Sequence, residues 1–297
     1  SLILSGYRLL VPNLSELKNR LDEINIDYEL KADIDISMFY HQKTESELVS
    51  LKNYLINRKE SGKEDNLDKW IRMVATNRLT GHSKNFFSVY TLPPNQAISQ
   101  EKQIKINKER NQIPEYKDIK KIIFIKSNNL INQIKEDVRL HLLEIYSNAI
   151  FLNKDARQTS EIKNESVNLT VTSPPFLNIV QYDEDNWLRC WFNDIDVNKV
   201  SITMAKKVDE WSEIMQDVFN ELYRITRKNG WVAFEVGEVN NGKIKLDEYI
   251  VPIGINAGFE CHGILINSQK FTKTSNIWGI KNNSKGTNTN RIVIFKK

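Results

Sequence analysis

The stretch that decides the fold is NLTVTSPPF, residues 168–176. Leu169 and Val171 alternate with polar residues, and this alternation predicts a β-strand that is buried on at least one face. Pro174 and Pro175 each lack an amide hydrogen and fix φ, so the chain can neither continue a strand ladder nor begin a helix there. We therefore expect a stiff loop at the carboxyl end of a strand, which is where ligands bind in open α/β sheets.

The expected loop offers three groups that suit one chemistry: the Ser173 hydroxyl, the Pro174 carbonyl and the Phe176 ring. The exocyclic amine of a nucleobase is a poor nucleophile because its lone pair is delocalised into the ring. Acceptors aimed at its N–H groups favour the pyramidal, nucleophilic form, and an aromatic ring stacks on the base. The alternative interpretation is a strand-terminating turn with a buried phenylalanine.

The sequence before the strand carries a family resemblance. Asn153-Lys154-Asp155-Ala156-Arg157 precedes it, separated by a polar connection. This order resembles the S-adenosylmethionine-dependent amino-methyltransferases of DNA, which methylate N4 of cytosine or N6 of adenine. In that family, a strand ending in Asp-Ala precedes a strand ending in Ser/Asp/Asn-Pro-Pro-Tyr/Phe. The resemblance covers residues 148–297 well and the rest more loosely.

The resemblance implies an α/β fold with a Rossmann-like class I methyltransferase sheet, of which this chain shows the second half clearly. It implies S-adenosylmethionine as cofactor, no metal, and double-stranded DNA as partner, typically in a restriction-modification system. The serine at 173 favours the N4-cytosine subgroup, with N6-adenine as the alternative. The implied catalytic residues are Ser173, Pro174, Pro175 and Phe176, and the implied cofactor-binding residues are Asp155, Ala156 and Thr172.

One family feature is missing from these 297 residues. The family carries a glycine-rich loop of the type Asp-Pro-Phe-x-Gly-x-Gly, and the eleven glycines here are scattered. Three explanations are open: an omitted N-terminal part, a second subunit that carries the loop, or a loss of cofactor binding. We favour the first two, because Ser1–Tyr7 is typical of the end of the helix that follows such a loop, with Gly6 as its cap.

Charge is concentrated in an expected insertion at residues 77–126, where ten Lys/Arg stand against four Asp/Glu, whereas the whole chain has a net charge of only +4. Clustered positive charge attracts a phosphate backbone. The stretch at 77–87 mixes donors, cations and two adjacent aromatic rings. We therefore predict DNA contacts there, the alternative being an ordered loop that packs Phe86 and Phe87 into the core. The predicted DNA-binding residues are Arg78, Thr80, His82, Lys84, Asn178 and Tyr182.

The composition excludes several other classes. Cys190 and Cys261 are far apart and form no CxxC pattern, which argues against a disulfide framework or a zinc site. No apolar run is long enough to span a bilayer and no signal peptide is visible, so we expect a cytoplasmic protein without a membrane partner. Neither cysteine follows a proline, so the nucleophile typical of cytosine-C5 methyltransferases is missing.

Periodicity predicts the remaining elements, with a mainly helical region at 1–147 and an α/β region at 148–297. The resemblance implies that the α/β region is the catalytic one. The expected helices are 14–25, 45–58, 67–74, 98–112, a long or broken region at 117–147, 208–226 and 246–257. The expected strands are 8–11, 149–152, 168–172, 231–236, 263–266 and 291–295, the last of them closing an edge of the sheet.

Two other function classes stay open beside the DNA methyltransferase. An RNA or protein-glutamine methyltransferase would share the fold, but such enzymes typically carry Asn-Pro-Pro-Tyr. A non-catalytic or split subunit that binds DNA and needs a partner for cofactor binding would explain the missing glycine loop. The run from Asp155 to Phe176 counts against a complete loss of catalysis.

Overall fold

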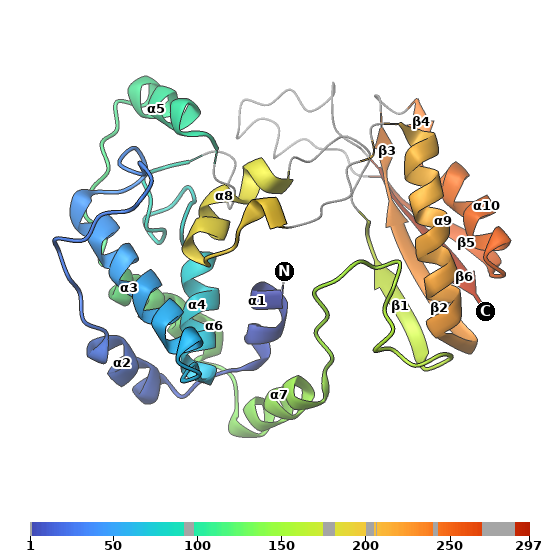
Figure 1. Cartoon of the computed structure of the whole chain (residues 1–297), viewed down its shortest axis with the longest axis horizontal. Helices are drawn as coiled ribbons and strands as arrows, with labels where there is room; N and C mark the ends of the chain where they lie inside the picture. The colour runs from blue at the N-terminus through green and yellow to red at the C-terminus, as the bar shows by residue number, and fades with distance from the viewer. Residues whose placement is uncertain are drawn as a thin grey trace. The chain divides into compact units, whose positions relative to one another are not determined.

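The computed structural model describes residues 2–91, 98–174, 182–199, 205, 207–239, 243–268 and 289–297. They form two compact units (Figure 1). Each unit has its own buried core. Unit 1 comprises Ser1–Phe151 and Tyr182–Ser201, and unit 2 comprises Leu152–Gln181 and Ile202–Lys297. The chain therefore enters unit 2 after residue 151, returns to unit 1 for one segment, and ends in unit 2. The division into functional domains at residue 147 stays a prediction.

Unit 1 is helical, and the helices predicted from periodicity are confirmed with small shifts at their ends. The expected region at 117–147 is two helices, separated by residues 132–135. The elements of unit 1 are α1 Leu2–Ser5, the 3-10 turn η1 Gly6–Leu9, α2 Leu14–Glu23, α3 Gln42–Glu60, α4 Asn66–Thr76, α5 Gln100–Glu109, α6 Ile119–Ile131, α7 Glu136–Asn148, α8 Tyr182–Phe192 and the 3-10 turn η2 Val197–Lys199.

Side-chain caps start several of these helices where the sequence places short polar residues. The Asn13 side chain accepts the amide of Ser15 at the start of α2, and Asp118 accepts the amide of Lys121 at the start of α6. Asp65 and Asp68 form a reciprocal capping box at the start of α4. Each cap satisfies amide groups that have no partner within the helix, so local sequence determines where these helices begin.

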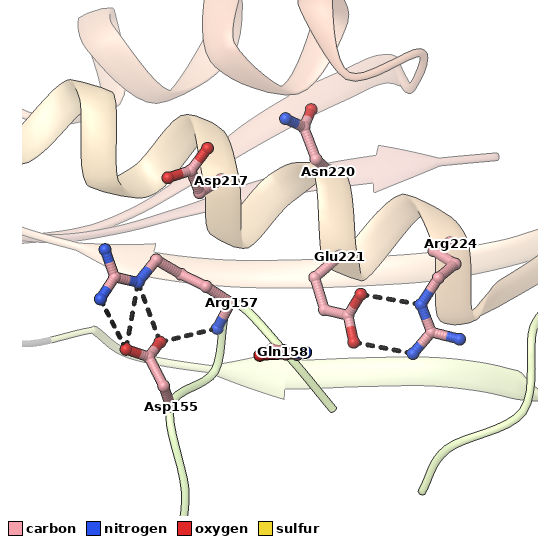
Figure 2. Close-up of a pocket in the computed structure, with 7 residues that line it drawn as sticks. All are labelled: Asp155, Arg157, Gln158, Asp217, Asn220, Glu221 and Arg224. Atoms are coloured by element: carbon pink, nitrogen blue, oxygen red, sulfur yellow. Dashed lines mark hydrogen bonds and ion pairs between the residues drawn. The ribbon is translucent and has the colours of Figure 1, made fainter. Parts of the chain in front are cut away.

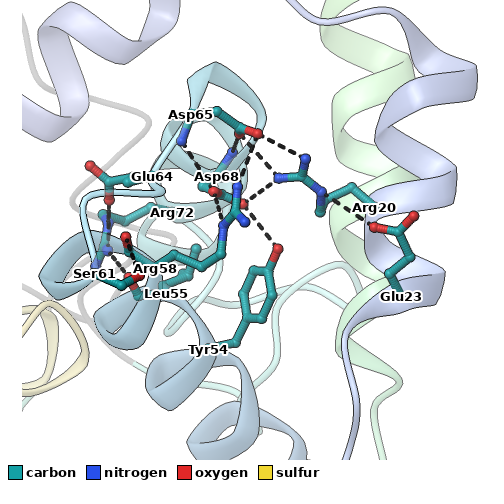
Figure 3. A network of polar contacts seen from close by, with 10 residues as sticks. All are labelled: Arg20, Glu23, Tyr54, Leu55, Arg58, Ser61, Glu64, Asp65, Asp68 and Arg72. Atoms are coloured by element: carbon teal, nitrogen blue, oxygen red, sulfur yellow. Dashed lines mark hydrogen bonds and ion pairs between the residues drawn. The ribbon is translucent and has the colours of Figure 1, made fainter.

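A buried carboxylate joins three helices of unit 1 (Figure 3). Asp68 on α4 is fully buried and accepts hydrogen bonds from Arg20 of α2 at 2.7 Å, Arg58 of α3 at 2.6 Å and Tyr54 of α3 at 3.2 Å. The Asp65 carboxylate also accepts hydrogen bonds from both arginines. Because every lone pair of a buried carboxylate needs a donor, these residues position α2 and α3 against α4.

The predicted strand at 8–11 is wrong. Residues 6–9 form the turn η1, and Leu10 follows as its cap. Leu10 and Val11 are buried, so the apolar residues at 8–11 indicate burial and not an extended backbone. A helix does end at Ser5 as expected, but Gly6 starts a second turn instead of capping the first. A side chain at Gly6 would begin 3.1 Å from the ring of Phe151.

Unit 2 is a four-stranded sheet with two helices. Its strands are β1 Val167–Thr172, β2 Thr226–Val236, β5 Glu260–Ser268 and β6 Thr289–Lys296, in the order β1-β2-β6-β5. β1 runs parallel to β2, whereas β6 is antiparallel to both of its neighbours. A short hairpin of β3 Glu238–Val239 and β4 Ile244–Lys245 follows β2. The helices are α9 Val208–Ile225 and α10 Asp247–Asn256.

The core of unit 2 lies between these helices and one face of the sheet. Val232 and Phe234 of β2 are buried, as are their β6 partners Phe295 and Val293. Phe219 of α9 packs on this layer, with its ring centroid 4.8 Å from that of Phe234 and 5.2 Å from that of Phe295. The alternation of buried and exposed residues along β2 follows from the period of two in a strand.

Three sequence expectations for this sheet are wrong. β6 lies between β2 and β5, so it does not close the edge. No strand forms at 149–152, because residue 149 caps the end of α7 and Ile150 is 66% exposed. The strand at β1 is confirmed, but Leu169 and Val171 are 56% and 74% exposed. β1 is an edge strand, and its threonines pair with the helix-facing residues of β2.

Candidate active site and nucleic-acid contact loop

The carboxyl end of β1 lies where the sequence predicts a loop. Thr172 is the last residue of the strand and pairs with Phe234 of β2. Ser173 is exposed and Pro174 is half-buried, and neither belongs to a helix or strand. The hydroxyl of Ser173 is therefore accessible at the end of a strand that runs parallel to its neighbour. Pro175, Phe176 and Asn178 lie outside the described residues, as does the side chain of Tyr182 at the start of α8.

Asp155 lies in a turn and is held by one neighbour (Figure 2). Its carboxylate accepts the backbone amide of Arg157 at 2.9 Å and the guanidinium at distances down to 2.6 Å. The Arg157 side-chain and backbone hydrogen bonds lower the pKa of Asp155, so the carboxylate is ionised at neutral pH. Both side chains are exposed, and an ion pair of this kind is weak enough to exchange partners. Asp155 and Ala156 are both accessible to a ligand.

A polar pocket of about 550 Å³ lies between this turn and α9 (Figure 2). The α9 residues recur every three or four positions and so share one face of the helix. The pocket therefore combines three carboxylates with two guanidinium groups. The lining residues are Asp155, Arg157, Gln158, Asp217, Asn220, Glu221 and Arg224.

A second ion pair in this pocket ties the turn to the helix. Glu221 accepts both the amide and the hydroxyl of Thr159 at 2.6 Å each. Arg224 bonds the same carboxylate at 2.7 Å and donates to the carbonyls of Thr159 and Ile162 at 3.0 Å. The Arg224 hydrogen bonds, followed by those of Thr159, lower the pKa of Glu221 to about 2. Glu221 and Arg224 thus have a structural role in positioning residues 155–162.

The structure does not bring all predicted catalytic and cofactor residues into one cavity. Asp155 lines the pocket on α9, and neither Thr172, Ser173 nor Pro174 is among the lining residues. An adenine ring could meet the Asp155 carboxylate, but the described part of the pocket offers no glycine-rich backbone for the rest of S-adenosylmethionine. The described residues therefore fit one part of this cofactor only. They also contain no group of three or more His, Cys, Asp or Glu side chains arranged to hold a metal ion.

The stretch at 77–91 is an ordered loop on the core of unit 1. Phe86 and Phe87 are buried, which is the alternative that the sequence left open. Backbone bonds close the loop, from the amide of Phe87 to the carbonyl of Arg78 at 2.9 Å and from the amide of Thr91 to the carbonyl of Gly81 at 3.1 Å. A side chain on Gly81 would begin 2.5 Å from the Phe86 ring, so glycine permits this close packing.

The predicted DNA-binding residues of this loop differ in accessibility. His82 and Lys84 are exposed, and Arg78 is half-buried with its guanidinium 4.0 Å from the centroid of the Phe86 ring. Thr80 is only 5% exposed. Of the residues predicted to contact DNA in this loop, Arg78, His82 and Lys84 are therefore at least partly accessible, whereas Thr80 is buried.

Three residues that shape these sites, Arg157, Glu221 and Arg224, are not among the site residues predicted from the sequence. Arg157 was visible two positions after Asp155, a spacing that allows an ion pair. Glu221 and Arg224 lie on the polar face of an amphipathic helix, and their i,i+3 spacing signals a pair but not its attachment to residues 159–162. These attachments join residues about sixty positions apart, which no local pattern reports.

No helix within the described ranges is both long and apolar enough to cross a bilayer.

Comparison with known proteins gives partial matches. No family model matches the chain. Type II methyltransferase M.MjaI from Methanocaldococcus jannaschii is 32% identical over 120 residues. That alignment covers 35% of this chain and 38% of M.MjaI, so the chain matches well under half of this relative's length.

Two solved structures overlap the chain in part. TTHA0409 from Thermus thermophilus, a candidate DNA modification methylase complexed with S-adenosyl-L-methionine, is 17% identical and has a TM-score of 0.31. The overlap covers 48% of this chain and 51% of that one. A SAM-dependent methyltransferase from Methanosarcina mazei is 10% identical with a TM-score of 0.28, covering 55% of this chain and 79% of that one. In sequence, the chain is thus distantly similar to a type II DNA methyltransferase.

Proposed function

We propose that this chain carries the catalytic loop and a DNA-contact region of an S-adenosylmethionine-dependent DNA methyltransferase. The observation that carries the proposal is the Thr172-Ser173-Pro174 end of β1, which presents an accessible hydroxyl beyond a strand parallel to β2. The similarity to M.MjaI supports the same reaction class. The reaction is methyl transfer to the exocyclic amine of a base, N4-cytosine favoured over N6-adenine, within a restriction-modification system.

The loop residues would act on a base that has left the helical stack. An amine that is stacked and paired cannot reach a methyl donor, so the target base must be flipped out. In the proposed complex, the Ser173 hydroxyl and the Pro174 carbonyl accept the N–H groups of the amine, and Phe176 stacks on the base. Their contribution is orientation and the stabilisation of charge that develops on the nitrogen. No covalent bond to the protein is required.

A split cofactor site is the second part of the proposal. β1 lies at the edge of the sheet, where its outer backbone groups have no strand partner among the described residues. The side chain of Val171, on this strand, is 74% exposed. Unpaired edges of this kind accept a further strand. We propose that a further strand pairs there in parallel with β1, and that the glycine-rich loop and a helix follow this strand. A second subunit or an N-terminal segment would supply these elements. The non-catalytic subunit is the alternative.

The first test is calorimetric titration of this chain with S-adenosylmethionine. In the split-site proposal, we expect no measurable binding by the chain alone and binding after a polypeptide with the glycine-rich loop is added. Methylation of duplex DNA by the combined chains, followed by nuclease digestion and mass spectrometry, then identifies N4-methylcytosine or N6-methyladenine. RNA serves as the substrate control. Cofactor binding without methylation of either nucleic acid would contradict the enzymatic proposal.

A further inference from the structure

Two arginine side chains lie over aromatic rings of the loop at 77–91. The guanidinium carbon of Arg78 is 4.0 Å from the centroid of the Phe86 ring. Arg110, the residue that caps the end of α5, lies over Tyr90 in the same way, at 3.8 Å. A guanidinium packed on a ring keeps its N–H groups available for hydrogen bonds around its rim. The side chain of Arg110 is exposed, so these donors are accessible to a ligand.

Backbone contacts place the two rings in one ordered segment. Gly81 forms a β-bridge with Tyr90. The Phe86 ring packs on the other side of this contact, because a side chain on Gly81 would begin 2.5 Å from it. Arg78 and Arg110 are therefore each attached, through their own rings, to residues that lie side by side in the loop.

The end of α5 is fixed on Tyr90 independently of the arginine. The carbonyl of Tyr90 accepts the side-chain amides of Gln103 at 3.1 Å and of Gln112 at 3.0 Å. Both amides also donate to the side-chain oxygen of Asn107, at 2.7 and 2.8 Å. Gln103 and Gln112 lie on either side of Arg110 in the sequence, so these bonds hold its backbone beside the ring. A side chain positioned in this way loses less conformational freedom when it binds a ligand.

The charges around this loop favour an anionic ligand. Residues 77–91 include Arg78 and Lys84 and contain no Asp or Glu. Across the described ranges, neither Arg78 nor Arg110 forms an ion pair, and the carboxylate next to Arg110 in sequence, Glu109, lies 3.8 Å from Lys105. Exposed guanidinium groups without a neighbouring carboxylate attract phosphate oxygens, which they can bind through two N–H groups at once.

We infer that Arg110 is a phosphate-contact residue for duplex DNA, held in position by Tyr90, and that the DNA-binding surface of the loop extends onto the end of α5. This inference rests on the proposed function and adds Arg110 to the predicted contacts of Arg78, His82 and Lys84. Its ligand is a backbone phosphate, which is common to all sequences, so Arg110 orients the DNA without reading a base.

The test compares Arg110→Gln, Arg110→Lys and Arg8→Gln in the full chain. Arg8 is an exposed arginine of η1 without an ion pair among the described residues, so it is a matched control. Fluorescence anisotropy measures the binding of two duplexes of unrelated sequence over a range of salt concentrations. Loss of one phosphate contact reduces the magnitude of the slope of log K against log salt by about 0.9, and weakens binding about fivefold to tenfold at about 0.1 M salt.

We expect both changes for Arg110→Gln on both duplexes and neither change for Arg8→Gln. Arg110→Lys keeps the charge and should retain the slope of the wild type. Thermal unfolding of each variant separates a DNA contact from a structural role. If Arg110 only stabilises the loop, Arg110→Gln will lower the Tm and leave the salt slope unchanged, and this result would overturn the inference.

Methylation by the chain combined with a polypeptide that carries the glycine-rich loop separates the inference from the proposed function. Wild-type DNA binding by Arg110→Gln, together with methylation by the combined wild-type chains, would overturn the inference and leave the proposed function standing. The expected slope change without any methylation of DNA would support the inference and contradict the proposed function. A wild-type chain that binds RNA but not duplex DNA, or neither, would contradict both.

Discussion

At the scale of single residues, the candidate cofactor carboxylate is already engaged. The Asp155 carboxylate accepts a hydrogen bond from the backbone amide of Arg157 and forms an ion pair with its guanidinium. Both side chains are nevertheless exposed. A ligand can therefore replace Arg157 at little cost, since an exposed pair contributes at most about 1 kcal/mol. The lowered pKa of Asp155 means that the carboxylate is available as an acceptor throughout the neutral pH range.

The loop after β1 supplies the most direct prediction at this scale. Ser173→Ala removes one acceptor for the target amine, and we expect single-turnover methyl transfer to fall about 100-fold with the fold intact. Phe176→Ala removes the stacking ring and should cost about 1–3 kcal/mol of transition-state binding. The matched control is Ser160→Ala at another exposed serine. Rapid quench of the completed enzyme on duplex DNA gives the rates, and wild-type rates in both loop variants would refute these roles.

A second residue-scale prediction concerns the pH dependence of stability. Glu221 has a pKa of about 2 in the folded protein, below the value of about 4.3 in an unfolded chain. Its stabilisation is therefore complete above about pH 5 and is lost as the pH falls toward 2. We expect Glu221→Gln to lower the free energy of unfolding by about 2 kcal/mol at pH 7 and by much less at about pH 2.5.

Urea unfolding at several pH values measures this difference. Glu213→Gln is the control, because Glu213 lies on the same helix and has no ion pair among the described residues. An equal loss of stability at neutral and acidic pH in Glu221→Gln would show that the carboxylate charge is not what ties residues 159–162 to α9.

At the scale of elements, one buried carboxylate connects α2, α3 and α4. Asp68 accepts hydrogen bonds from Arg20, Arg58 and Tyr54, and it completes the capping box of α4. A buried ion pair is not by itself a source of stability, because desolvation offsets much of the attraction. Removal of one partner is costly all the same, since the remaining charges stay buried.

We therefore expect Asp68→Ala to lower the free energy of unfolding by about 3–5 kcal/mol. The control is Glu23→Ala, because Glu23 is an exposed partner of Arg20 at 3.6 Å and should contribute less than about 1 kcal/mol. Denaturant titration followed by far-UV circular dichroism measures both. Similar losses in the two variants would mean that the network of Figure 3 does not hold the three helices together.

At the scale of the whole molecule, the two units are interlaced in sequence. The segment Tyr182–Ser201 interrupts unit 2 and contributes Leu188 and Phe192 to the core of unit 1, where both are buried. Asn193 also donates to the Thr76 hydroxyl at 3.0 Å. A cut between residues 151 and 152 therefore leaves neither piece complete.

This interlacing predicts the behaviour of a fragment of residues 1–151. Each of the two lost apolar side chains is worth about 1.5–3 kcal/mol of burial, so we expect the fragment to unfold at a lower temperature than unit 1 in the full chain. A synthetic peptide of residues 182–201 should bind the fragment and restore its Tm. The control peptide replaces Leu188 and Phe192 with serine. A fragment as stable as the full chain, or a peptide without effect, would contradict this organisation.

Prediction from sequence succeeded or failed according to the range of the interaction. Periodicity located α2, α3, α4 and α9, because apolar residues repeat at helical spacing along each of them. In α2 and α9 the buried residues form a stripe, whereas every residue of α4 from Trp70 to Thr76 is buried. The same reasoning placed β1 correctly but expected Leu169 and Val171 to be buried, because alternation reveals two faces and not which one is covered. The strand predicted at 8–11 failed because an apolar run indicates burial in any backbone conformation.

The sequence by itself determined the local elements and the end of β1, because periodicity, capping side chains and the missing amides of two prolines act over a few residues. It also presented the Asp155 and Ser173 motifs that motivate the proposed methyltransferase. Only the tertiary structure decided the place of β6 inside the sheet, the attachment of residues 159–162 to α9, and the unit to which residues 182–201 belong. These features depend on contacts between residues far apart in the chain, and such contacts form only when the whole core is packed.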